Sequence, residues 1–435
     1  GGYTNQPVWM TNGVVLAAGG ANHSLFVKAD GTLWAMGDNS AGQLGTGTTG
    51  GSTNCPVLVT NDVVATAAGA VHSFFIRTDG TLYAMGNNNN GKLGIGMPAG
   101  GSTNVPVAVA ENVVAVAAGL DHSLLVKADG TLWAMGANNL GQLGIGSTPP
   151  TNRPAFVASN VVAVAAGANH SLFLRVDGTV WAMGNNSFGQ LGIGMVVGST
   201  NCPVLVTNQV VAIAAGLDHS FFIQADGSLY AMGNNSNGKL GIGLAAGSAN
   251  LPVLVTTNVM AMAAGAQHSL LVRADGTVWA WGYNLNGQLG NGTFTPTNRP
   301  MLLNSGSLIG ASLAKGPMAN HSMAMAYGRP VVDALRDQFV NSGQSAEVAI
   351  SVSGGDGPFA YQWQKDGVDL LNATNASYLI SSAAQADAGT YTLTVAGPFG
   401  IYKASVNLSV ISIEPASPLV SLGQPVSLSV SNGGP

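Results

Sequence analysis

The chain repeats itself about every 49 residues, and this period limits its possible folds more than any other feature. The seven histidines all occupy one register of the repeat, at His23, His72, His122, His170, His219, His268 and His321. A clear copy, at residues 165–194, reads "AAGANHSLFLRVDGTVWAMGNNSFGQLGIG". Six repeats keep nearly all of this pattern, and the seventh is worn. A period of this length in a β-rich sequence indicates a propeller or a solenoid.

Each repeat predicts four short strands. In the fourth repeat these are "VVAVAAG", "HSLFLRV", "TVWAMG" and, after a loop, "PVLVTN". We expect the Asp-Gly pair to form a two-residue hairpin turn, which in the first repeat would pair Val27 with Trp34. Both faces of that hairpin are apolar in the middle, so each face needs a covering neighbour, as a propeller blade has.

Position within the blade follows from side-chain size. The Ala-rich first strand suits the innermost position, where blades converge and space is short. The aromatic residue of the third strand is interpreted as packing between blades and is found at Trp34, Tyr83, Trp133, Trp181, Tyr230 and Trp279.

These units resemble the regulator of chromosome condensation repeat family, whose members are seven-bladed β-propellers. The resemblance implies an all-β fold with a propeller over residues 1–328. It also implies closure of the ring by pairing of the two ends in one blade. Here "GGYTNQPVWMTN" at the start matches the end of a repeat, and the seventh unit supplies only its first two strands. Blade seven is therefore expected to be incomplete, with its third strand upstream of Gly1.

The repeat stops after "MAYGRP", and residues 329–411 resemble an immunoglobulin-like β-sandwich of the kind found on bacterial secreted proteins. The resemblance makes Trp363 in "YQWQKDG" the core tryptophan and Tyr391 in "DAGTY" the tyrosine corner. Leu393 stands where the family has one cysteine, and Ile350 or Val352 where it has the other. Residues 412–435 restart the pattern and are expected to begin a second, truncated domain of the same kind.

Charge and composition exclude some partners. The chain carries 14 Lys and Arg against 19 Asp and Glu, and residues 1–328 carry 10 against 11. Scattered cations cannot neutralise the several phosphates that nucleic-acid binding requires. No apolar run approaches the roughly 18 residues of a membrane span, so we expect no membrane insertion. The two cysteines stand in repeats one and four, too far apart for a disulfide.

The His-Ser pairs invite a catalytic interpretation, but neighbours on a strand point to opposite faces, which argues against a nucleophile and its base. We expect the histidines to be structural and to hold the turn between strands one and two. Equivalent histidines in adjacent blades are also too far apart to share a metal ion, so neither a metal nor another cofactor is expected. No catalytic residue is assigned.

The residues that precede the histidines differ between repeats and should ring one end of the propeller. As candidate binding residues they are Asn22, Val71, Asp121, Asn169, Asp218, Gln267 and Asn320. The simpler interpretation of the aspartates is neutral variation in a solvated loop. Longer loops add apolar tips at Met97-Pro98, Met195-Val197 and Leu244-Ala246, which mark either a contact site or blade packing.

The sequence favours a non-enzymatic binding or adhesion scaffold of a secreted or surface-displayed bacterial protein. The propeller would present its loops to a protein or a glycan, and the chain is expected to be monomeric. Two alternatives stay open: a targeting module of a larger secreted enzyme, and a secreted inhibitor of another enzyme. The fold alone does not choose among them.

Overall fold

The computed structural model describes residues 4–8, 10–97, 100–195, 198–303, 308–314, 316–328, 331–334, 337–353, 359–397, 400–414 and 429–433. The chain divides into two compact units at residues 326 and 327. This boundary lies two residues before the one expected from the sequence. No described helix has the length and apolar character needed to cross a membrane.

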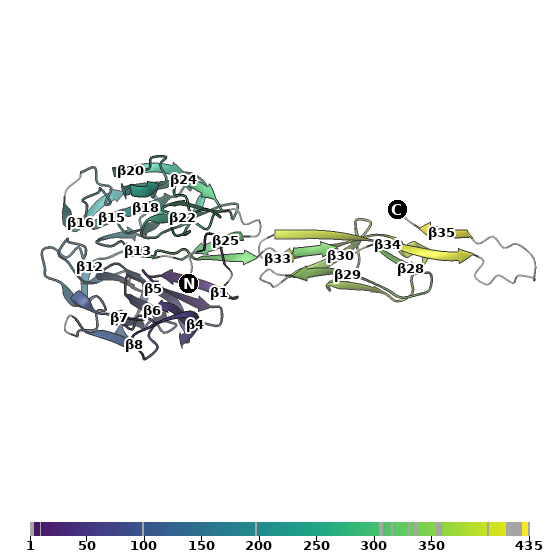
Figure 1. Ribbon diagram of the computed structural model, residues 1–435, viewed down its shortest axis with the longest axis horizontal. Coiled ribbons are helices and arrows are strands. Elements are labelled where there is room, and N and C mark those ends of the chain that lie inside the picture. Colours follow the sequence, from purple (N-terminus) through teal and green to yellow (C-terminus); the bar gives the residue numbers. More distant parts are fainter. Residues whose placement is uncertain are drawn as a thin grey trace, which may run out of the picture. The chain divides into compact units, whose positions relative to one another are not determined.

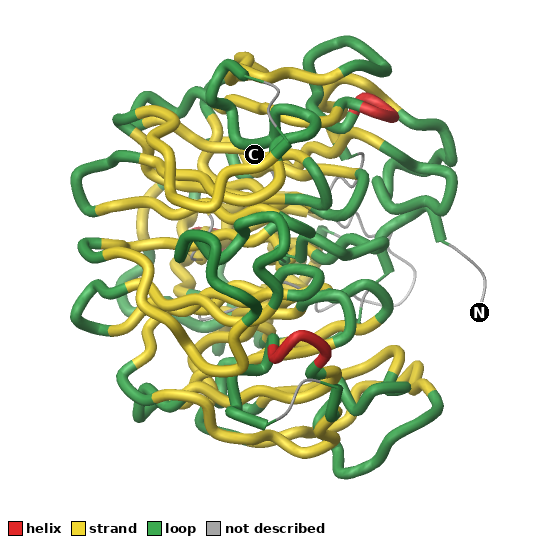
Figure 2. The backbone as a smooth tube through the Cα atoms, turned by 90° about the vertical axis from the view of Figure 1, so that its left-hand side faces the viewer, coloured by secondary structure: helices red, strands yellow, loops and turns green. Residues whose placement is uncertain are grey.

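The first unit contains six four-stranded antiparallel sheets, each formed by consecutive strands (Figure 1). Blades one to three comprise β1 (Val14–Gly19), β2 (His23–Lys28), β3 (Leu33–Asp38), β4 (Ser52–Thr60), β5 (Val63–Ala68), β6 (His72–Arg77), β7 (Leu82–Asn87), β8 (Ser102–Ala110), β9 (Val113–Ala118), β10 (His122–Lys127), β11 (Leu132–Gly136) and β12 (Thr151–Ala158). Blades four to six comprise β13 (Val161–Ala166), β14 (His170–Arg175), β15 (Val180–Asn185), β16 (Ser199–Thr207), β17 (Val210–Ala215), β18 (His219–Gln224), β19 (Leu229–Asn234), β20 (Ser248–Thr256), β21 (Val259–Ala264), β22 (His268–Arg273), β23 (Val278–Gly282) and β24 (Thr297–Leu302). Strands and loops dominate this unit, with short 3-10 turns such as η1 (Asn89–Gly91) and η2 (Ser236–Gly238) (Figure 2).

The hairpin register differs by one residue from the sequence prediction. Trp34 pairs with Phe26 rather than with Val27. The backbone N–H of Lys28 donates to Thr32, and that of Gly31 donates to Lys28, so the loop has three residues. Gly31 supplies the left-handed residue, with φ of 80°, that such a loop requires. The one-residue shift changes which side chains of the two strands lie opposite each other. Both faces of the hairpin still have apolar residues in the middle.

The fourth strands form the outer edges of the blades, and those of blades one to five are longer than predicted. β4 begins at Ser52, four residues before the "PVLVTN" segment. Pro56 therefore lies inside a strand, and an outer edge tolerates it because no further strand needs its missing N–H. The first strands of consecutive blades contact one another, which confirms their innermost position.

The hydrophobic core lies between the blades. In the first interface, Leu25 and Ala35 of blade one pack in one cluster with Phe75 and Met85 of blade two, and Tyr83 covers this cluster. Equivalent clusters fill the following interfaces up to blade seven. This confirms the blade-packing interpretation for the aromatic residues of the third strands, five of which are partly buried against such clusters.

Blade seven joins the two ends of the propeller unit. Its first strands are β25 (Leu308–Leu313) and β26 (Ala324–Gly328), which form a two-stranded sheet. The N-terminal segment completes a contact made by the fourth strands elsewhere: Asn5 Nδ2 donates to the carbonyl of Gly292 at 2.9 Å, as Asn104 does to Gly47. Among the described N-terminal residues, Asn5 therefore meets blade six as a fourth strand meets the preceding blade elsewhere, and closure of blade seven by an N-terminal strand stays a prediction.

The second unit is an immunoglobulin-like sandwich. Its elements are β27 (Val331–Ala334), β28 (Gln338–Asn341), β29 (Ala346–Ser353), β30 (Ala360–Lys365), β31 (Val368–Asp369), β32 (Ser377–Ile380), η3 (Gln385–Asp387), β33 (Gly389–Gly397), β34 (Gly400–Glu414) and β35 (Ser429–Gly433). Trp363 and Leu393 are buried in its core with Ile350. The Tyr391 hydroxyl donates to the carbonyl of Asp387 at 2.9 Å, which forms the expected tyrosine corner. β35 pairs with the last residues of β34, and whether residues 412–435 begin a second domain stays a prediction.

Candidate functional site

Seven hydrogen bonds between histidine and serine side chains join each blade to the next in a closed ring. His170 Nε2 lies 2.9 Å from Ser220 Oγ of the following blade, and the other pairs are equivalent. His321 of blade seven reaches back to Ser24 of blade one at 2.7 Å, which closes the ring. The full set is His23–Ser73, His72–Ser123, His122–Ser171, His170–Ser220, His219–Ser269, His268–Ser322 and His321–Ser24.

This arrangement corrects part of the expected role of the histidines. They are structural, and in blades one to six each imidazole packs against the glycine of the turn between strands one and two, but their side-chain hydrogen bonds go to the next blade and not to the backbone of that turn. Adjacent residues such as His170 and Ser171 do point apart, as predicted. The contact across blades was missed because strand alternation describes one sheet and not its neighbour.

In six of the seven pairs, a second hydrogen bond of the serine fixes the histidine tautomer. Ser220 Oγ donates its proton to the carbonyl of Gln190 at 2.8 Å, so it can only accept from His170. His170 therefore carries its proton on Nε2, and its Nδ1 is buried with no hydrogen-bond partner. The same two bonds recur at Ser73, Ser123, Ser171, Ser269 and Ser322. These serine hydroxyls are buried, or half-buried at Ser322, and each already makes two hydrogen bonds, which makes them poor nucleophiles.

Burial keeps the ring histidines uncharged. It is the main cause that lowers the pKa of His23, His122 and His219 to about 4, and that of His170 and His268 to about 3. The pKa of His72 and that of His321 are also lowered, chiefly by burial. A protonated imidazole would also need an acceptor for its Nδ1–H, and the Nδ1 atoms of six of these histidines are buried without a hydrogen-bond partner.

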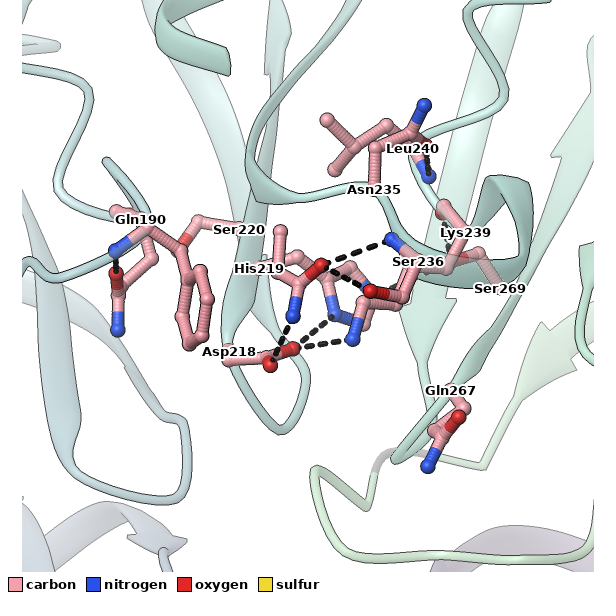
Figure 3. Close-up of polar contacts among 12 residues, drawn as sticks. Gln190, Asp218, His219, Ser220, Asn235, Ser236, Lys239, Leu240, Gln267 and Ser269 are labelled. Carbon is pink, nitrogen blue, oxygen red and sulfur yellow. Dashed lines mark hydrogen bonds and ion pairs between the residues drawn. The ribbon is translucent and has the colours of Figure 1, made fainter. Parts of the chain in front are cut away.

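Two buried lysines lie in the loops beside the ring of histidines and serines. Lys92 and Lys239 replace the glutamine of the "GQLG" segment, and each side chain is only 2% exposed. Lys92 Nζ pairs with Asp121 Oδ1 of the next blade at 2.7 Å. Lys239 Nζ pairs with Asp218 of its own blade (Figure 3). Each buried ammonium thus has one carboxylate. This carboxylate belongs to the next blade for Lys92 and to the same blade for Lys239.

The surroundings of Asp218 keep it ionised. Burial raises its pKa, but the charge and the hydrogen bond of Lys239 outweigh burial and hold that pKa well below its usual range. Asn234 Nδ2 also donates to its second oxygen at 2.7 Å. Since His219 is neutral, Lys239 is the cation that balances Asp218. The expectation of a solvated, neutrally varying aspartate is therefore wrong at this position, and Asp121 is likewise paired.

The candidate binding residues do occupy equivalent places, each directly before a ring histidine. We call this end of the propeller the loop end; there the second strands begin and the third strands finish. Asn22 and Asn320 are exposed, whereas Val71, Asn169 and Gln267 are half-buried. Gln267 accepts a hydrogen bond from Asn237 Nδ2 at 2.9 Å. A binding role for this set stays a prediction, and its two aspartates already serve the buried lysines.

The opposite end, where the second and third strands meet in the Asp-Gly hairpins, is called the hairpin end. In five blades a cation of the second strand lies over the aromatic ring of the third, at 4.2 to 5.2 Å from the ring centre. The exposed hairpin aspartate receives hydrogen bonds from the residue two positions later, and these lower its pKa at Asp30, Asp79, Asp129, Asp177, Asp226 and Asp275.

The remaining candidates form no centre in the described part of the chain. Cys55 and Cys202 are free and exposed. Among the described side chains, His, Cys, Asp and Glu form no group of three suited to a metal ion. The apolar loop tips are exposed at Met97, Met195 and Leu244, while Pro98 and residues 196–197 lie outside the described residues.

Comparison with solved structures places the propeller among known folds. Human WBSCR16 is similar with a TM-score of 0.65 and 22% identity, over 74% of this chain and 88% of that one. Prp20p from Saccharomyces cerevisiae is similar with a TM-score of 0.65 and 24% identity, over 72% and 82%. At these identities the likeness concerns the fold.

Among curated proteins, the Decoration protein of Escherichia phage T5 is 33% identical over 86 residues, which is 20% of this chain. The chain spans about half, 52%, of that relative's length. A model of the immunoglobulin I-set domain matches residues 330–410. A model of the RCC1-like domain matches residues 3–324. The chain belongs to the RCC1-like domain family and carries an immunoglobulin I-set domain after its propeller.

Proposed function

We propose that this protein is a non-enzymatic binding scaffold whose propeller contacts a protein partner. The observation that carries the proposal is the ring of buried histidines and serines. The residues most suited to catalysis in each repeat serve to hold the blades together, and this leaves a rigid body with two exposed ends. Rigid elements that present variable loops are a common basis for recognition.

Similar propellers support a protein partner over a glycan. One structure of yeast Prp20p is described together with its binding to Gsp1p and histones, and a second structure shows yeast RCC1 (Prp20) with Kap60 bound to it. We extend only the class of partner, a protein, to this chain. We also propose that the chain is a monomeric part of a secreted or surface-displayed bacterial protein, with the I-set domain as a spacer.

The test is a binding screen with the full chain. The immobilised protein is presented with an array of purified proteins from its environment and with a glycan array, and each hit is titrated. The proposal expects saturable one-to-one binding to a protein, with no chemical change in that protein. Binding to glycans alone, or catalytic turnover of a hit, contradicts it. Protease accessibility of the chain on intact cells tests the surface location.

A further inference from the structure

We propose that the hairpin end of the propeller is a docking surface for a basic protein segment that carries apolar side chains. This inference rests on the proposed protein-binding function and names the end that acts and the chemistry of its partner. Two independent observations support it. One is a ring of exposed apolar residues, and the other is an unequal division of charge between the two ends.

The apolar ring is produced by one backbone irregularity that recurs in every four-stranded blade. Each first strand contains a β-bulge after its first residue, which leaves the second residue without a partner in the register. These bulge residues are between 44% and 67% exposed and are all apolar: Val15, Val64, Val114, Val162, Val211 and Met260. The residue before each bulge residue, such as Val63 or Val113, is buried and fills the interface between blades. Core packing therefore explains the first apolar residue of each strand but not the exposed second one.

The bulge residues lie close to the axis at the hairpin end. The first strands are innermost and begin at this end, because each pairs antiparallel with a second strand that finishes there. Six exposed apolar side chains therefore gather around one centre. Exposed apolar residues on the outer strands, such as Leu58 and Phe156, are instead spread around the circumference.

Charge separates the two ends of the propeller. Among its described residues, eight carboxylates stand in the exposed turns of the hairpin end: Asp30, Asp62, Asp79, Glu111, Asp129, Asp177, Asp226 and Asp275. Five cations share this end: Lys28, Arg77, Lys127, Arg175 and Arg273. The net charge there is 5 − 8 = −3. The loop end has four described cations, Lys92, Arg153, Lys239 and Arg299, and three carboxylates, Asp38, Asp121 and Asp218, and so a net charge of +1.

The charges at the hairpin end differ in their availability. The five cations are half-buried over aromatic rings, whereas the eight carboxylates are exposed. The turns use the Oδ1 atom of each hairpin aspartate, for example through the Thr32 and Thr179 hydrogen bonds. An apolar centre surrounded by accessible carboxylates is complementary to a segment with apolar residues and flanking Lys or Arg.

The test uses three labelled peptides as probes on the full chain: a Lys/Leu amphipathic peptide, a Lys/Ser peptide and a Glu/Leu peptide. We expect saturable binding of the Lys/Leu peptide, at least tenfold tighter than that of the other two and weakened by salt. Equal binding of all three peptides, or no saturable binding of the Lys/Leu peptide, overturns the proposal.

Variants locate the surface. Replacing Val64, Val114 and Val162 together by Ser should weaken Lys/Leu binding at least tenfold. The matched control replaces Leu58, Phe156 and Leu205 by Ser, which are similarly exposed on the outer strands, and should leave binding unchanged. The double variant Asp62→Asn and Glu111→Ser removes charge with residues that other repeats carry at the same turn, and should weaken binding several-fold. Loss of binding in the outer-strand control, or none in the valine variant, overturns the proposal.

Accessibility is tested directly with a thiol. Val114→Cys, in a chain whose two cysteines are replaced by Ser, should react with a maleimide in the free protein and be protected by the Lys/Leu peptide. If the introduced thiol fails to react even without peptide, and crosslinks form between this position and residues beyond 330, the chain's own second domain covers the apolar ring. That result overturns the proposal.

A natural protein partner separates the two proposals. If such a partner binds and only loop-end variants such as Asn22→Ala and Asn169→Ala weaken its binding, the protein-binding function is supported and the proposed docking surface is wrong.

Discussion

The Nε2 atom of His321 lies 2.7 Å from the Oγ atom of Ser24, although 297 residues separate them in the chain. This contact is the seventh of a series whose other members join consecutive blades. The closed ring therefore depends on side chains at the two ends of the propeller unit as well as on the N-terminal segment.

Replacing Ser24 by Ala should destabilise the protein by about 1–3 kcal/mol, because the half-buried Nε2 atom of His321 then loses its hydrogen-bond partner. The free energy of unfolding is measured by urea titration. The control is Ser52→Ala, an exposed serine on an outer strand, which should change stability by no more than about 0.5 kcal/mol. Equal effects of the two changes would show that the closing bond contributes nothing.

The ring predicts loss of stability in acid. Each ring histidine has a folded-state pKa below the usual 6.5, so the unfolded chain binds more protons as the pH falls. Stability is fully present above about pH 6.5 and is lost progressively as the pH falls through 4 to 3. The loss amounts to about 1.4 kcal/mol per histidine for each pH unit over which only the unfolded chain is protonated. Urea midpoints measured from pH 8 to pH 5 should fall steeply below pH 6.5, and a flat profile would contradict the neutral ring.

The pair Asp218 and Lys239 should show strong coupling. Asp218→Asn leaves a buried ammonium without its carboxylate and should cost about 3–5 kcal/mol. Adding Lys239→Gln recreates the combination that repeat four has at Asn169 and Gln190, and should restore most of the stability. Additive effects in this double-mutant cycle would mean that the two side chains do not interact in solution.

A glycine beside each ring histidine leaves room for the imidazole. A Cβ atom at Gly167 would lie 2.1 Å from Cε1 of His170 and 2.7 Å from the carbonyl oxygen of Gly216 in the next blade. Gly167→Ala should therefore lower the melting temperature by several degrees or prevent folding. Gly198→Ala, where nothing lies within 4 Å, is the matched control and should leave the melting temperature unchanged.

The repeat made most of the fold predictable. The period and the alternating small and large strands were sufficient for a seven-bladed propeller. The one-residue error in the hairpin had a local cause: Asp-Gly suits a two-residue turn, but Gly31 here serves as the left-handed residue of a three-residue loop. Trp363 and Tyr391 were predictable because each carries a family pattern of its own.

The side-chain contacts between blades were not predictable from one strand at a time. His170 meets Ser220 across an interface that sequence separation hides, and Asp218 meets Lys239 within a loop whose path the sequence does not define. A signal was present nonetheless. Both lysines that replace glutamine in "GQLG" are accompanied by an aspartate before a nearby histidine, which neutral variation would not require.

Hydrogen exchange of the full chain, measured with and without a bound protein partner, distinguishes the hairpin end from the loop end as the docking surface. Protection on binding should be concentrated at the hairpin end, in segments such as 28–32, 77–81 and 111–115. The loop-end segments before the histidines, such as 20–22 and 167–169, should exchange equally in both states. Protection confined to the loop end would contradict the assignment of the docking surface, and opening of the blades on binding would contradict the rigid scaffold.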